Sequence, residues 1–388
     1  MKNYLRICLV SAAYRPYPSG VSEHIYNLAV ALKNLGQDVT ILTTNFPNYS
    51  HLRTSFDEPV PVFRFGRAVL VPLNRSYATL PVGWNLPNQV AEFLSRNRFN
   101  IVHCHGLFWP EISYWAIHYS NAVNLVTFLT AGFKIHTSYS GLFRLLFRHQ
   151  IKKIHGRIAI SNRAKAAIEH YLPGEYRIIP SGIDLTRFSP LIDRRKPSGS
   201  PTILFVGRLD KRKGVTVLIR AMPLILKFLP EARLIVVGKG PMDKACQILV
   251  QRLGIAKAVD FVGAVSQSDL PNYYHNADVF CSPALGGETQ GVVLLEAMAC
   301  GVPVVASRIP GYDETVQDGI NGLLCPPNDI KSLSQLIVQV LINDKLRCEL
   351  INNALERVKL YAWPLVAEKT LNYYLELLGY AERVTTSR

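Results

Sequence analysis

Residues 201–229 read PTILFVGRLDKRKGVTVLIRAMPLILKFL and contain one complete strand–loop–helix unit. The apolar run at 202–206 is short and rich in β-branched and aromatic residues, as in a buried strand. The apolar stretch that follows residue 214 is long enough for a helix. A strand followed by a helix is the repeating unit of a doubly wound parallel sheet, whose ligands bind at the carboxyl ends of the strands. The basic loop between the two elements therefore lies where we expect a ligand.

The same alternation continues on both sides of this unit. Strands are expected at 5–12, 37–45, 100–106, 122–129, 156–161 and 176–182, and again at 201–210, 232–240, 258–265, 278–284 and 302–308. The charged, Pro/Gly/Ser-rich segment LIDRRKPSGS separates the two series. We therefore predict an α/β protein with two doubly wound parallel-sheet domains facing a central cleft. The expected domains are residues 1–190 and 201–365, joined by a linker at 191–200, with a final helix at 366–388 that packs back on the first domain.

Composition excludes several classes of protein. The chain has 388 residues, of which 48% are hydrophobic and 18% charged, so it can bury two cores and is not disordered. Its seven cysteines include no CxxC pair, which argues against a zinc finger or a disulfide framework and for a reducing, cytoplasmic compartment. We interpret the N-terminus as a strand rather than a signal peptide. The longest uncharged stretch, 112–133, carries too many polar groups to span a membrane.

The excess of positive charge is concentrated in the first half of the chain. Lys and Arg number 43 against 28 Asp and Glu, a net charge of +15, and no acidic residue lies between Glu111 and Glu169. Within that window, SGLFRLLFRHQIKKIHGR (140–157) predicts a basic amphipathic helix with Leu142, Leu145, Leu146 and Phe147 on its apolar side. Its cations are Arg144, Arg148, Lys152 and Lys153. Two interpretations stay open: a face that contacts an anionic membrane, or a core helix with a solvated basic side. No sequence pattern favours nucleic acid as a partner.

Three loops could carry chemistry. Ser19-Gly20 precedes a helix, where backbone N–H groups can approach an anion, although such turns often only reverse the chain. GRLDKRKG (207–214) places several cations at a strand end, which suits a diphosphate. GGETQGVVLLEAMACG (286–301) combines glycines, a helix start, Glu288 and Glu296. The two carboxylates can both reach one extended ligand and bind its hydroxyl groups. Alternatively, Glu296 pairs with a structural arginine.

These motifs resemble those of the GT-B glycosyltransferases of family 4. The resemblance rests on GRLDKRKG, on the Glu288-to-Glu296 segment and on EAMACGVPVVAS, and it covers nearly the whole chain. Within the family the chain is most similar to phosphatidylinositol mannosyltransferases, through SGVSEHIYNLA, GRIAISNRAK and IIPSGIDLTRF. The resemblance implies a retaining transfer of a hexose, mannose from GDP-mannose, to a lipid such as phosphatidylinositol. It implies no cofactor or metal, and an enzyme peripherally attached to the inner face of the cell membrane.

The resemblance also implies residue roles. Arg208 and Lys213 would neutralise the diphosphate with help from Arg212, and with Glu288 they form the expected catalytic set. The remaining donor contacts would be Gly20, Val265, Gly287, Thr289, Gln290, Gly291, Val292 and Glu296, the last of which would hold the ribose. Tyr14 and Ser22 fall where relatives contact the acceptor. His103 and His105 flank Cys104, and we expect one in the core and one in the cleft, without a metal.

Two departures from the family pattern bear on function. Leu129 stands where the relatives carry a histidine that touches the transferring sugar. Its absence affects the rate or the choice of acceptor unless His105, His136 or another group takes over that contact. Ser266 and Gln267 replace groups that would recognise guanine. Two alternatives therefore remain: a family 4 enzyme that uses a UDP-sugar and a soluble or polyprenyl-linked glycan, and a catalytically silent protein that binds a nucleotide sugar.

Overall fold

The computed structural model describes residues 4–49, 58–73, 76–107, 111–130, 140–191 and 200–386. Its chain divides into two compact units. Unit 1 comprises residues 1–182 and 363–388, and unit 2 comprises residues 183–362. The expected boundary at 190/191 differs from this division, because residues 183–190 pack with unit 2: Ile183 pairs with Ala362, and Phe188 lies in the core beside Tyr274. Most of the expected linker, 192–199, lies outside the described residues.

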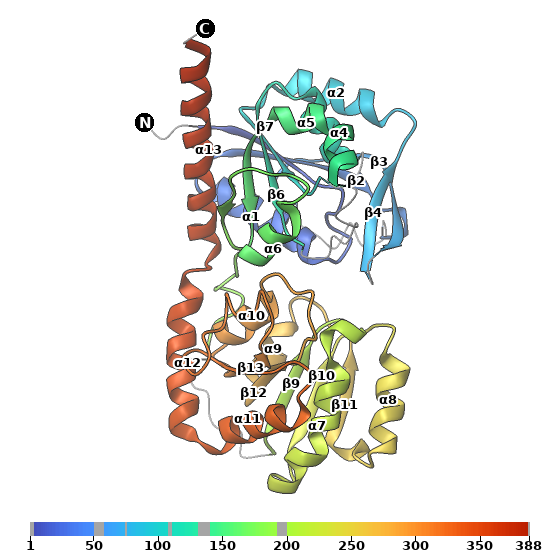
Figure 1. Cartoon of the computed structure of the whole chain (residues 1–388), viewed down its shortest axis with the longest axis vertical. Coiled ribbons are helices and arrows are strands. Elements are labelled where there is room, and N and C mark those ends of the chain that lie inside the picture. The colour runs from blue at the N-terminus through green and yellow to red at the C-terminus, as the bar shows by residue number, and fades with distance from the viewer. Residues whose placement is uncertain are drawn as a thin grey trace. The chain divides into compact units, whose positions relative to one another are not determined.

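Unit 1 contains an eight-stranded sheet in the order β4-β3-β2-β1-β5-β6-β7-β8, parallel except for the antiparallel pair β3–β4. Its strands are β1 (Arg6–Val10), β2 (Asp38–Asn45), β3 (Val62–Leu73), β4 (Ser76–Val82), β5 (Ile101–His105), β6 (Val123–Phe128), β7 (Ile154–Ala159) and β8 (Arg177–Ile178). The β3–β4 hairpin was not predicted from the sequence. It extends the sheet beyond the parallel strands and is visible at the edge of unit 1 in Figure 1.

Helices cover both faces of this sheet. They are α1 (Gly20–Asn34), α2 (Leu86–Asn97), α3 (Ile112–Tyr119), α4 (Ser140–Leu146), α5 (Arg148–Lys153), α6 (Asn162–Ile168) and α13 (Trp363–Thr386). One face packs against α2, α3, α4 and α5 through a core that includes Phe93 and Phe147. The other packs against α1 and α13 through Leu28, Trp363 and Tyr374. The C-terminal helix therefore belongs to unit 1, and it begins at residue 363 rather than 366 (Figure 1).

The predicted basic helix at 140–157 is wrong in two respects. It is split into α4 and α5 at Phe147, and residues from Ile154 onward form β7 instead. Phe143 and Phe147 stack with ring centroids 4.3 Å apart and turn into the core. As a result Leu145 and Leu146 are not buried: they are 61% and 62% exposed.

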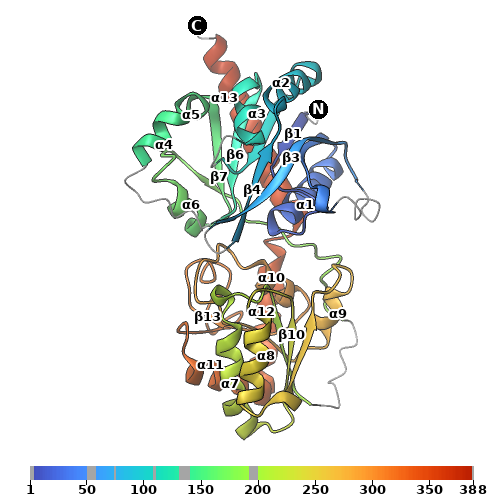
Figure 2. The ribbon, with the colours of Figure 1, turned by 90° about the vertical axis from the view of Figure 1, so that its right-hand side faces the viewer.

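Unit 2 is a six-stranded parallel sheet in the order β11-β10-β9-β12-β13-β14. Its strands are β9 (Thr202–Val206), β10 (Arg233–Val237), β11 (Val259–Gly263), β12 (Val279–Ser282), β13 (Val304–Ser307) and β14 (Leu323–Cys325). One face is covered by α7 (Val215–Phe228), α8 (Asp243–Arg252) and α11 (Ile330–Ile342), as Figure 2 shows. The other is covered by α9 (Leu270–His275), α10 (Val292–Ala299) and α12 (Asp344–Lys359). The expected doubly wound parallel architecture is confirmed.

Candidate active site

The basic loop after β9 is held against the end of β12. Asp210 caps the 3-10 turn Lys211–Lys213, its Oδ1 accepting a hydrogen bond from the Lys213 backbone N–H at 3.0 Å. Gly214 follows with φ +68°, and a Cβ there would lie 1.9 Å from the carbonyl oxygen of Pro283. Only glycine permits this approach. The loop therefore lies beside the segment that leads from β12 toward α10.

Arg212, Lys213 and Glu288 form one ion cluster across these two loops. Arg212 Nη1 lies 2.9 Å from Glu288 Oε1 and 2.7 Å from the carbonyl oxygen of Gly287. Lys213 Nζ lies 3.1 Å from Glu288 Oε2. The Glu288 side chain is only 10% exposed. The structure thus brings together three residues that the sequence assigned to one donor site, and it pairs the carboxylate with the two cations.

The glycine-rich turn before α10 packs against residues that the sequence motifs did not identify as part of the site. Gly291 has φ +77°, and a Cβ there would lie 2.5 Å from a ring carbon of Tyr312. Thr315 Oγ1 donates a hydrogen bond to the carbonyl of Gln290 at 2.7 Å, and the Tyr312 hydroxyl lies 2.8 Å from Ser282 Oγ. These contacts fix the turn that carries the predicted donor residues Gly287, Thr289, Gln290, Gly291 and Val292. Hydroxyl groups far along the chain give no local sequence signal.

Glu296 lies in α10 (Val292–Ala299). The buried Tyr274 hydroxyl donates a hydrogen bond to Glu296 Oε2 at 2.7 Å. Burial, and then the neighbouring carboxylate, raises the pKa of Tyr274 well above its ordinary value, so the phenol keeps its proton. The Tyr274 hydroxyl therefore helps to orient this carboxylate.

The other predicted residues of unit 2 lie around this cluster. Arg208 is exposed at the end of β9, and Val265 packs partly buried against the α9–α10 core. Beside it, Ser266 Oγ donates to Asp269 Oδ2 at 2.6 Å, and Gln267 accepts a hydrogen bond from Arg187. Ser266 and Gln267, the two residues that replace groups expected to recognise guanine, thus form hydrogen bonds within unit 2.

In unit 1, Gly20 begins α1 behind the cap residue Ser19, which accepts a hydrogen bond from the Ser22 backbone N–H at 3.1 Å. Ser22 Oγ donates to the carbonyl of Tyr17 at 2.7 Å. Tyr14 is fully buried, and its hydroxyl donates to Glu58 Oε2 at 3.1 Å. Both predicted acceptor residues are therefore covered and engaged inside unit 1 in this structure.

The expectation of one core and one cleft histidine is wrong. Residues two apart on a strand point to the same face, so His103 and His105 lie together, with ring centroids 4.3 Å apart. His24 completes the cluster, 5.4 Å from His105. Burial lowers the pKa of His105 to about 4 and lowers those of His24 and His103. All three imidazoles are therefore neutral near pH 7.

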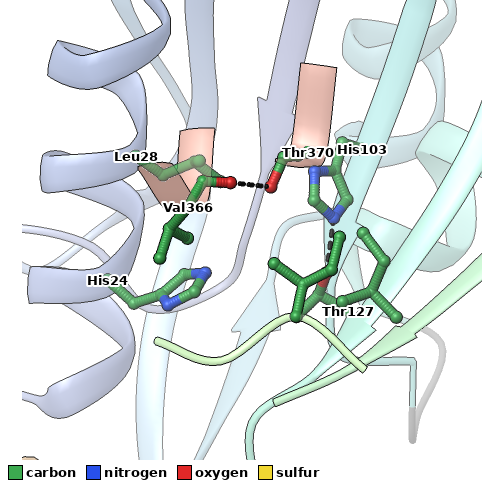
Figure 3. A pocket seen from close by; sticks show the side chains of 8 residues that line it. His24, Leu28, His103, Thr127, Val366 and Thr370 are labelled. Atoms are coloured by element: carbon green, nitrogen blue, oxygen red, sulfur yellow. Dashed lines mark hydrogen bonds between the residues drawn. The ribbon is translucent and has the colours of Figure 1, made fainter. Parts of the chain in front are cut away.

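Hydrogen bonds tie this cluster to α13 and β6. His103 lies 2.6 Å from both the Tyr374 hydroxyl and Thr127 Oγ1, and His24 Nδ1 lies 2.9 Å from Ser181 Oγ. Figure 3 shows His24 and His103 beside a small cavity that Val366 and Thr370 also line. Leu129 packs instead against Ala159, Ile160 and Ala164, and His136 lies outside the described residues. The cluster is thus part of the α1–α13 core.

The predicted membrane-facing cations lie on α4 and α5. Arg144, Arg148 and Lys152 are exposed, whereas Lys153 is half-buried and donates to the carbonyl of His118 at 2.7 Å. Burial lowers the pKa of Lys153. Across the described ranges, no helix is both long and apolar enough to cross a bilayer. Among the same residues, no three His, Cys, Asp or Glu side chains are grouped to hold a metal ion.

Known proteins share both the sequence and the fold. Residues 18–187 match the family model of Glycosyltransferase Family 4, and residues 192–357 match that of Glycosyl transferases group 1. A phosphatidyl-myo-inositol mannosyltransferase of Mycolicibacterium smegmatis is 32% identical over 386 residues, covering 99% of this chain and 97% of the relative. A GDP-mannose-dependent alpha-(1-6)-phosphatidylinositol monomannoside mannosyltransferase of the same organism is 34% identical over 202 residues, 49% of this chain and 51% of the relative.

Among solved structures, HepE of Anabaena in complex with UDP superimposes with a TM-score of 0.78 at 17% identity, covering 96% of this chain and all of that one. The two parallel-sheet units are thus those of a GT-B glycosyltransferase. The chain belongs to glycosyltransferase family 4, and phosphatidyl-myo-inositol mannosyltransferases are among its full-length relatives.

Proposed function

We propose that this glycosyltransferase transfers mannose from GDP-mannose, with retention of configuration, to a membrane lipid such as phosphatidylinositol. The observation that carries the proposal is the cluster of Arg212, Lys213 and Glu288 beside the start of α10. Two cations and a helix N-terminus at the carboxyl end of a parallel sheet suit a diphosphate leaving group. The relatives named as phosphatidylinositol mannosyltransferases support the choice of sugar and acceptor.

The chemistry follows from these side chains. The bond between the anomeric carbon and the diphosphate oxygen breaks, and Arg208, Lys213 and the α10 amides stabilise the charge that develops on the leaving group. The acceptor hydroxyl attacks from the face that the diphosphate leaves, which retains the anomeric configuration. Its proton passes to the departing phosphate oxygen. Because protein cations stabilise the leaving group, this route needs no divalent metal and no cofactor.

Peripheral attachment to the inner face of the cell membrane is part of the proposal. Arg144 and Arg148 flank Leu145 and Leu146, so exposed cations and exposed apolar side chains occupy one short segment. Such a segment can contact lipid phosphates and place leucines at the edge of the acyl region. Lys152 adds a third exposed cation on α5.

Mass spectrometry of a reconstituted reaction tests the function. The purified protein is incubated with GDP-mannose and liposomes that contain phosphatidylinositol, with chelator present, and mannosylated lipid is the expected product. GDP-mannose binding by calorimetry without product from any acceptor would favour the silent nucleotide-sugar-binding protein, since Leu129 supplies no imidazole. Binding and transfer only with UDP-sugars would overturn the assignment of the donor.

A further inference from the structure

The carboxylate of Glu288 is fully occupied by the cations of its own site. Its Oε1 pairs with Arg212 at 2.9 Å and its Oε2 with Lys213 at 3.1 Å. The side chains are little exposed, at 10% for Glu288, 16% for Lys213 and 32% for Arg212. Water screens such charges less than it screens surface pairs. In this state the Glu288 carboxylate offsets part of the charge of the two cations, and Asp210 Oδ2 lies 3.9 Å from Arg212 Nη2.

The two partners of Glu288 are the same cations that the proposed function assigns to the diphosphate. A diphosphate carries more negative charge than one carboxylate and offers more acceptor oxygens, so it competes for the same donors. Arg212 is additionally held by the carbonyl of Gly287 at 2.7 Å. Lys213 ends in a flexible stem whose ammonium can turn toward a ligand.

Two glycines precede Glu288 in the turn. Gly286 and Gly287 both adopt positive φ values, +138° and +76°. Nothing lies within 4 Å of the position that a Cβ of Gly286 would take. Because the carbonyl oxygen of Glu288 is packed closely beside Gly311, the backbone of the turn stays in place and the Glu288 carboxylate moves by rotation of its side chain.

We propose that Glu288 acts as an internal counter-anion, which the donor's diphosphate displaces from Arg212 and Lys213 so that the carboxylate becomes available to a hydroxyl of the donor sugar. The inference rests on the proposed function and deepens it. Recognition of the sugar then depends on arrival of the diphosphate, because until then the carboxylate is bound to the two cations. A free hexose is not bound by Glu288 in this scheme.

Calorimetry with inorganic pyrophosphate measures the displacement of Glu288 from Arg212 and Lys213 without contributions from the nucleotide base or the sugar. Wild type is compared with Glu288→Gln at fixed pH and ionic strength. We expect Glu288→Gln to bind pyrophosphate about tenfold more tightly, a change of about 1.4 kcal/mol, because no carboxylate then competes for Arg212 and Lys213. The matched control is Glu231→Gln, which makes the same charge change at an exposed turn before β10 and should bind as wild type does. Equal or weaker binding by Glu288→Gln, in a folded protein, would overturn the inference.

A second variant guards against loss of structure in the first. Glu288→Asp keeps the charge but shortens the side chain, so the ion pair with Lys213 is weakened. Pyrophosphate binding should therefore again be tighter than in wild type. Adding the mannosyl group should then improve binding of wild type over GDP alone, but not binding of Glu288→Gln. If GDP-mannose is turned over while no Glu288 variant gains affinity, the exchange is wrong and the function stands. If pyrophosphate binding shows the gain but no GDP-sugar is used, the proposed donor is wrong and the exchange stands.

Discussion

Gly214 lies so close to Pro283 that a Cβ on the glycine would be 1.9 Å from the proline carbonyl oxygen. Gly214 closes the basic loop after β9, and Pro283 directly follows β12, the strand that pairs with β9. The contact fixes the spacing between the cations of one loop and the carboxylate of the other. We therefore expect this glycine to control both stability and donor binding.

Gly214→Ala should lower the free energy of unfolding and weaken GDP-mannose binding. The left-handed conformation costs alanine about 1 kcal/mol, and the clash with the Pro283 carbonyl adds about 1–3 kcal/mol. Gly254→Ala is the matched control, because Gly254 has φ +67° but nothing lies within 4 Å of the position that its Cβ would take. Urea denaturation measures both variants. Equal destabilisation of the two would show that the contact with Pro283 contributes nothing.

Arg208→Ala should lower turnover about a hundredfold, because removing one charge-assisted contact from the leaving group costs roughly 3 kcal/mol of transition-state stabilisation. Lys211→Ala is the control, since Lys211 is an exposed lysine of the same loop that has no part in the proposed mechanism. Initial rates at saturating donor check the prediction. Full turnover by Arg208→Ala contradicts the assigned role.

Tyr274→Phe should weaken binding of GDP several-fold by releasing the Glu296 carboxylate from its 2.7 Å hydrogen bond. A hydrogen bond to a charged group contributes about 1.5–3 kcal/mol. If Glu296 holds the ribose, the same substitution should not change the affinity for 2′,3′-dideoxy-GDP, which lacks the hydroxyl groups. Calorimetry with both nucleotides separates the two cases. An equal loss for both would show that Tyr274 supports the fold rather than ribose recognition.

Stability should fall as the pH drops from 6.5 toward 4. Burial lowers the pKa of His105 from 6.5 to about 4, so folding disfavours the protonated form. The corresponding stabilisation is complete above the unfolded pKa and is lost as the pH falls through this window, with a contribution of about 3 kcal/mol. His24 and His103 pack against this ring and shift in the same direction.

His105→Leu tests this dependence, because leucine fills the apolar site without a titrating group. The free energy of unfolding, measured by urea at pH 7, 6 and 5, should decrease less steeply for the variant than for wild type. His149→Leu replaces an exposed histidine and should leave the wild-type slope in place. If the free energy of unfolding depends on pH equally steeply in wild type and His105→Leu, His105 is not the group responsible.

Leu145→Asp combined with Leu146→Asp should abolish flotation with anionic liposomes, and Arg148→Glu should weaken it by about 1 kcal/mol or more at low salt. The control is Ile342→Asp, which places a single new carboxylate at an apolar residue of unit 2 that is 65% exposed. Flotation that survives the double substitution, or that does not weaken with salt, excludes this segment as the membrane contact.

The alternation of parallel strands and helices in both units, and the positions of the three candidate loops at strand ends, could be predicted from the amino-acid sequence alone. Those features depend on the local run and spacing of apolar residues and on glycines at strand ends. Apolar spacing was insufficient at 140–157: Phe147 is buried as expected, but Phe143 joins it in the core while Leu145 and Leu146 are exposed. It was also insufficient for the unit boundary, because the packing of Phe188 on Tyr274 involves residues far apart in the chain.

Which functional groups meet one another depended on the tertiary structure. Lys213 and Glu288 are 75 residues apart, and they form an ion pair because β9 and β12 are neighbours in the sheet. Likewise Tyr274 reaches Glu296, and the side chains of Tyr14 and Ser22 are used within unit 1. Periodicity specifies which face of an element is buried. It does not specify which distant polar group will satisfy a buried charge, since that depends on which strands are neighbours in the sheet.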